Sequence, residues 1–134
     1  MMVMDIAEYL QSNGVGTIGD TIFVSQYPPI QTAHLVLYEY QGEQANQFAE
    51  TESPGLQIMA RASAYEAAHE LIVAANRVLR AVGFETGEPD GITVNGTRYY
   101  RIAPTLSGEI NLGFNDDAGL MELTKNYYVL MDEQ

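Results

Sequence analysis

Residues 63–83 carry the pattern that most restricts how this chain can fold. Ser63 and Glu66 have the S-x-x-E spacing of a capping box, in which each side chain accepts a hydrogen bond from a backbone N–H of the first helical turn. Gly83 is a common type of C-terminal stop. The pattern predicts one long helix over roughly residues 64–82, with an apolar stripe that must be buried: Ala68, Leu71, Ile72, Ala75, Val78, Leu79 and Val82.

The other apolar segments have the composition or the two-residue alternation of strands. The clearest is a hairpin at Asn95-Gly96, because a type I′ turn needs two positive φ angles and this dipeptide accepts both. Its arms are residues 92–94 and 97–104. Further strands are predicted at Thr21–Ser25, Ala33–Tyr40, Leu56–Ala62 and Leu120–Met131, and a short helix at residues 4–10.

This element order indicates an α+β fold with a single two-layer domain over residues 1–134. We expect a mostly antiparallel, mixed sheet of about five to six strands, packed on one long helix, with a short N-terminal helix beside it. Residues 42–55 are polar and acidic, so they are predicted to form a long, mobile loop.

The charge balance excludes several classes of function. The chain has 134 residues, with six basic against 18 acidic side chains and a formal charge of -12. Such a surface repels phosphate, which argues against tight non-specific nucleic-acid binding and against docking on an anionic membrane. The absence of cysteine excludes disulfides and thiolate metal sites, and the start of the chain does not resemble a signal peptide.

Candidate catalytic residues are few. Glu66 and His69 have the spacing of a metal-ligand pair on a helix, and Asp116-Asp117 could offer oxygen ligands to a cation. A capping residue and a polar turn explain these residues more simply, so we expect no metal, no cofactor and no enzyme activity. A small metal- or ligand-binding, enzyme-like domain using these residues is the alternative from another class.

Tyrosine is abundant, with nine residues and no tryptophan. Adjacent tyrosines in a strand send one ring to each face of the sheet, so the face that packs no helix would expose aromatic rings unless a partner covers it. We therefore predict a self-association surface on the sheet and its edges that includes Arg98, Tyr100, Arg101 and Tyr128. Half-buried sheet residues without such a role are the alternative.

The order of short motifs resembles the minor capsid and tail terminator proteins of long-tailed bacteriophages. The motifs run from Pro54 to Arg61, then through Tyr65 and Ala67-Ala68, Gly91-Ile92, Arg98-Tyr99, Leu112-Gly113, Asp116-Asp117, Gly119 and Asn126-Tyr127. The resemblance covers nearly the whole chain and departs from the family pattern at residues 42–53.

The resemblance implies a structural virion protein of the tail and neck region, assembled in the host cytoplasm. Its copies would form a hexameric ring that caps the tail tube and meets the head connector, with DNA only as passing cargo. A head-completion or neck adaptor protein is the alternative. In such a ring we expect the acidic loop to become ordered on assembly, with Phe48 as its anchor and Glu43, Glu50 and Glu52 toward a neighbour or the bore.

Overall fold

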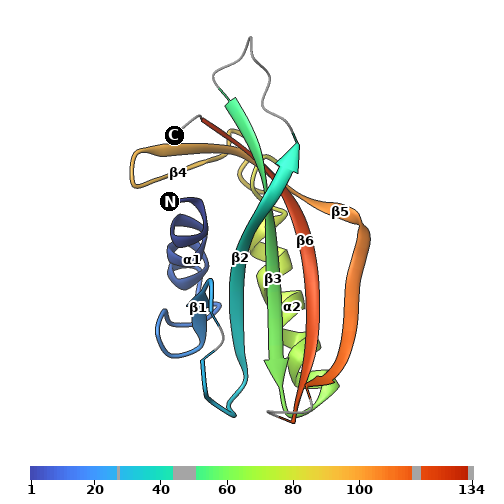
Figure 1. Cartoon of the computed structure of the whole chain (residues 1–134). Coiled ribbons are helices and arrows are strands. Elements are labelled where there is room, and N and C mark those ends of the chain that lie inside the picture. The colour runs from blue at the N-terminus through green and yellow to red at the C-terminus, as the bar shows by residue number, and fades with distance from the viewer. Residues whose placement is uncertain (27, 44–50, 116–118, 133–134) are drawn as a thin grey trace.

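The computed structural model describes residues 1–26, 28–43, 51–115 and 119–132, and these residues form two helices and a six-stranded sheet (Figure 1). The strand order is β1-β2-β3-β6-β5-β4, with β1 and β2 parallel and every other pairing antiparallel. The predicted α+β class with a mixed, mostly antiparallel sheet is therefore confirmed. The elements are α1 Met2–Ser12, β1 Ile22–Val24, β2 His34–Glu43, β3 Thr51–Ala62, α2 Tyr65–Leu79, β4 Ile92–Val94, β5 Thr97–Asn115 and β6 Leu120–Asp132.

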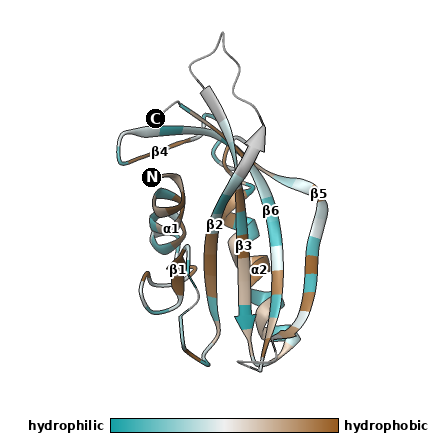
Figure 2. Ribbon diagram, viewed as in Figure 1, coloured by the Kyte–Doolittle hydropathy of each residue, from teal (hydrophilic) through white to brown (hydrophobic). Residues whose placement is uncertain are grey.

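Both helices pack on one face of the sheet, which we call the first face. Leu37 of β2 lies opposite Ile58 of β3, and Leu123 of β6 lies opposite Ala60, two residues further along β3 on the same face. All of them are fully buried in the main core. Against them lie the buried stripes of α1, including Ile6, and of α2, including Ile72. Figure 2 shows the apolar run of the lower part of β2 that takes part in this packing. Burial of these side chains at about 25 cal/mol per Å² holds the two layers together.

The helix over the sheet is shorter than the sequence predicts. α2 covers 15 residues rather than residues 64–82, and it shares the first face with the 11-residue α1. The capping-box prediction is wrong, because Ala64 rather than Ser63 occupies the N-cap and no side chain caps the helix. Ala64 has extended backbone angles (φ -136°, ψ 150°), which start the helix one residue late and leave Glu66 too near the start to complete the box.

The predicted hairpin is confirmed. Asn95 and Gly96 have φ angles of 49° and 81°, and Ile92 pairs with Tyr99 across the turn. β5 then continues beyond Pro104 for a total of 19 residues, pairing with β6 through several register shifts. The sequence patterns do not reveal this extension.

The hairpin is tied to α1 by polar side chains. Asp5 is buried in α1 and accepts hydrogen bonds from the Tyr99 hydroxyl and, at 2.9 Å, from the Asn95 amide. The same amide lies 2.6 Å from a carboxylate oxygen of Glu8. These contacts close the edge of the domain where the hairpin crosses over α1 (Figure 1).

The loop predicted at residues 42–55 is partly wrong. β2 extends to Glu43 and β3 begins at Thr51, because β6 is long enough to pair with the start of β3 as far as Asp132. Glu43 and Glu52 are thus strand residues, while Phe48 and Glu50 lie outside the described residues. Neither helix in the described part of the chain is long and apolar enough to cross a bilayer.

The turn after α2 generates a test of backbone packing. Gly83 has a φ of 78°, and a Cβ added there would lie 2.3 Å from the carbonyl oxygen of Tyr100. Gly14 has the same φ angle with no atom within 4 Å of such a Cβ, so it is a matched control.

We expect Gly14→Ala to lower the free energy of unfolding by about 1 kcal/mol through φ strain alone. Gly83→Ala adds a clash with β5 and should lower it by at least about 2 kcal/mol. Urea unfolding followed by circular dichroism measures both. Equal losses in the two variants would contradict a tight approach of this turn to β5.

Candidate assembly interface

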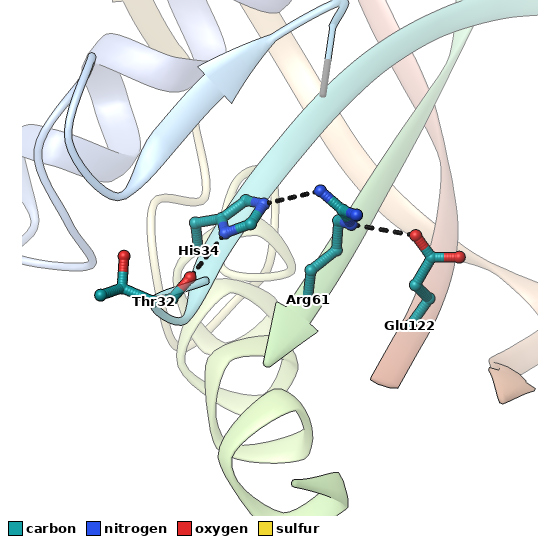
Figure 3. A network of polar contacts seen from close by, with 4 residues as sticks. All are labelled: Thr32, His34, Arg61 and Glu122. Carbon is teal, nitrogen blue, oxygen red and sulfur yellow. Dashed lines mark hydrogen bonds and ion pairs between the residues drawn. The ribbon is translucent and has the colours of Figure 1, made fainter. Parts of the chain in front are cut away.

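A polar network joins three strands on the second face of the sheet, opposite the helices (Figure 3). The Arg61 Nε atom lies 2.9 Å from Glu122 Oε2, and Arg61 Nη1 lies 3.3 Å from His34 Nε2. His34 belongs to β2, Arg61 to β3 and Glu122 to β6, and all three are buried. Removing one member of such a buried ion pair costs about 3–5 kcal/mol, so the network fixes how the strands lie side by side.

The hydrogen bonds of His34 define its protonation state. Nδ1 lies 2.7 Å from the carbonyl oxygen of Thr32 and must donate a proton to it, which leaves Nε2 to accept from the Arg61 guanidinium. Burial lowers the pKa of His34, and the nearby positive charge of Arg61 lowers it further, against the opposing effects of Thr32 and Glu122. The ring is therefore a neutral structural link.

The other end of the second face exposes aromatic rings. Register places Tyr40 and Tyr128 on either side of Gly55, and a Cβ on Gly55 would lie 2.3 Å from the Tyr40 ring. The Tyr40 ring thus lies over the glycine. Burial, and the neighbouring Tyr128 phenol, raise the pKa of Tyr40. With Leu130 on the same face of β6, these residues form a tyrosine patch whose three large side chains are 37–42% exposed.

A second exposed apolar region lies on the distal arm of β5, residues 105–115. β4 pairs only with residues 97–99, so within the described residues no strand covers the outer edge of this arm. Leu106 is fully exposed, and Leu112 and Phe114 are more than half exposed. Figure 1 shows the arm at the side of the sheet, and Figure 2 shows apolar residues recurring along it.

The sequence alone does not identify the distal arm as an exposed apolar edge. Glycines at positions 108 and 113 have positive φ angles and interrupt the alternation that marks a strand. The available signal is the recurrence of four large apolar residues among small and polar ones: Leu106, Ile110, Leu112 and Phe114. An unpaired edge with exposed apolar side chains is a ready template for pairing with another chain.

The interface residues predicted from sequence lie in different places. Tyr100 donates a 2.7 Å hydrogen bond to Asp132, which is the main cause of its raised pKa, and the Arg98 guanidinium lies 5.1 Å from the centre of the Tyr100 ring. Arg98 also donates to the Asp90 carbonyl oxygen. Arg101 is exposed near the end of α2, and Tyr128 lies in the tyrosine patch. Arg98 and Tyr100 are thus brought together, while their role in self-association stays a prediction.

The candidate metal ligands are not gathered into one site. His69 Nδ1 lies 2.8 Å from Glu109 Oε1 on β5, and its ring stacks on Tyr65, whereas Glu66 is exposed. The part of the chain that the structure describes contains no group of three histidine, aspartate or glutamate residues able to hold a metal ion. Asp116 and Asp117 fall outside that part.

Comparison with known proteins identifies one family. A family model described as bacteriophage tail terminator protein matches residues 9–133, a span that contains the whole sheet and α2. None of the curated proteins matches the chain.

The His34 network generates a test by pH. Well above the usual pKa of 6.5, the folded and unfolded chains both hold a neutral ring. Below pH 6.5 the unfolded chain binds a proton that the folded protein, with its lowered pKa, does not bind. The free energy of unfolding therefore falls as the pH falls.

We expect the free energy of unfolding to fall by up to about 1.4 kcal/mol per pH unit from this group as the pH drops from about 6.5 toward about 5. His34→Gln should remove this component, because an amide does not titrate, while His69→Gln should retain it. Urea unfolding at a series of pH values measures the slopes. A wild-type slope in His34→Gln would show that His34 is not the titrating group.

Proposed function

Because the chain belongs to the bacteriophage tail terminator family and is a structural protein of the phage tail, we propose that its copies form a closed ring that caps the tail tube. The ring, of six copies as the family resemblance implies, would meet the tail tube protein on one side and the head connector on the other. It would act by assembly, without catalysis. The observation that carries the proposal is the apolar edge of the distal arm of β5, which no strand of the described residues covers.

A ring requires two different contact surfaces on each copy, since a contact between identical surfaces closes after two copies. The sheet offers two such surfaces at its opposite ends. One is the outer edge of the distal arm. The other is the outer edge of β2 at residues 38–43, because β1 pairs only with residues 35–37 and no further described strand covers β2. Edge-to-edge pairing would satisfy the backbone groups of both strands and cover Leu112 and Phe114.

The charge of the chain supports a channel through which DNA passes without binding. Each copy carries a formal charge of -12, and acidic side chains around a bore repel the phosphate backbone. Glu43, Glu50 and Glu52 belong to the acidic stretch that we propose to face a neighbour or the bore, with Phe48 as its anchor. The site of action would be the virion tail and neck, after assembly in the host cytoplasm.

The distal arm can be tested with paired substitutions. Leu112→Asp with Phe114→Asp places two carboxylates where an apolar contact is proposed, and we expect the association constant of the ring to fall at least tenfold. Met4→Asp on α1 is the control, since Met4 is also exposed but belongs neither to the distal arm of β5 nor to residues 38–43 of β2. Light scattering after size-exclusion chromatography measures the size of the oligomer over a range of concentrations. The oligomer is also determined on isolated tail tubes. A ring of undiminished stability in the double variant would contradict the edge contact.

The interface predicted from sequence has a test of its own. Replacing Tyr100 and Arg101 together with alanine should weaken the oligomer while the far-UV spectrum stays unchanged. Because Tyr100 is bound to Asp132 within one copy, Asp132→Asn serves as a control that weakens this internal bond and leaves both side chains in place. If only the Tyr100/Arg101 variant dissociates, these residues contact a neighbour; if the oligomer is unchanged, the assignment is wrong.

A further inference from the structure

The outer side of α2 carries separated charges at regular spacing. Glu66, Glu70, Val73, Arg77 and Arg80 follow one another at intervals of four and three residues, the spacing that places side chains on one stripe of a helix. All five are exposed, and Val73 is 41% exposed at the middle of the stripe. The stripe is therefore acidic at one end, apolar at the centre and basic at the other end.

These charges have no counterparts within the described chain. The ion pairs there join Arg61 to Glu122 and His69 to Glu109, and none involves the stripe. Along the helix, the two glutamates are four residues apart and the two arginines three apart, so neighbouring like charges repel. The helix dipole favours acids at the first turn and bases at the last, but it gives no reason for an exposed valine between them.

We propose that the outer face of α2 docks antiparallel against the same face of a second copy of this chain. A two-fold axis at Val73 would place Glu66 opposite Arg80 and Glu70 opposite Arg77, with the two valines in contact at the centre. Each copy would then supply both halves of the charge pattern, and four cross-pairs would form around one small apolar contact. A second copy is the occupant because no other partner is needed to complete the pattern.

The surroundings of the basic end favour an incoming acidic helix end. A hollow of about 270 Å³ lies beside Arg77 and Arg80 and is bordered by Phe84, which is about half exposed. Arg101 lines an adjoining hollow of about 310 Å³. Three of the six basic residues of a strongly acidic chain thus lie around this one region.

This contact is distinct from the proposed ring contact. It closes after two copies, and it uses a helix on the first face rather than the sheet edges. A contact made by one helix face is small, so we expect weak, concentration-dependent association. Because the pairs are exposed at the rim, salt should weaken them.

Charge reversal tests the pairing directly. Glu66→Arg with Glu70→Arg makes an all-basic stripe, and Arg77→Glu with Arg80→Glu makes an all-acidic stripe. The Asp20→Arg and Asp90→Arg double variant makes the same charge change as the first, in exposed turns outside α2. All are prepared in the Leu112→Asp and Phe114→Asp background, so that association through the sheet edge is weakened and the two proposals fail or succeed separately.

Sedimentation velocity at low ionic strength is the measurement, with far-UV circular dichroism to verify folding. We expect the parent, which carries only Leu112→Asp and Phe114→Asp, and the Asp20/Asp90 control to form dimers. Their association constant should fall at least tenfold in about 1 M salt, where the Debye length is about 3 Å. Each stripe variant should be monomeric alone, and an equimolar mixture of the two should form dimers. Should a stripe variant fail to fold, Val73→Lys places two like charges at the axis and should abolish the dimer. Stripe variants that dimerise like the parent, a monomeric parent, or a mixture that stays monomeric would overturn the proposal.

Discussion

The antiparallel pairing of β3 with β6 is the interaction on which the rest of the structure depends. It runs from Thr51 opposite Asp132 to Ala62 opposite Met121. Along each of the two strands, alternate side chains point to opposite faces of the sheet. Alternate residues such as Ile58 pack under α2, while Arg61 and Glu122 meet on the second face. A slip of one residue in either strand would turn that strand's apolar set away from the helices and separate the ion pair, so burial and charge select the same register.

Local chemistry accounts for the parts of the fold that could be predicted. Asn95-Gly96 specifies its turn through two positive φ angles. The buried apolar stripe of α2 can be predicted from the helical spacing of its own residues. The extension of β5 depends on distant residues instead. β5 continues beyond Pro104 because β6 is present to pair with it, and no pattern within residues 105–115 encodes that partner.

The candidate interface shows the same division. Tyr128 is exposed as the alternation of β6 predicts, but Tyr100 is occupied by Asp132, 32 residues away. The His34–Arg61–Glu122 network joins residues separated by 27 and 61 positions, so nothing in a single segment reveals it. Phe114 can be identified as a candidate contact residue only once the strand order is known, because no described strand lies outside β5 at that position. Exposure is a property of the assembled sheet, and spacing within one segment does not contain it.

The polar tie between α1 and the hairpin has a consequence for the order of folding. Asp5 belongs to α1, which leaves the ribosome before its partners Asn95 and Tyr99, because these follow 90 and 94 residues later. At about 5–20 residues per second, the helix waits roughly 5–20 s for them. Contacts of such long sequence separation close late and slow the folding of a domain. The polar tie between α1 and the hairpin is therefore among the last contacts to form, although α1 is made well before its partners.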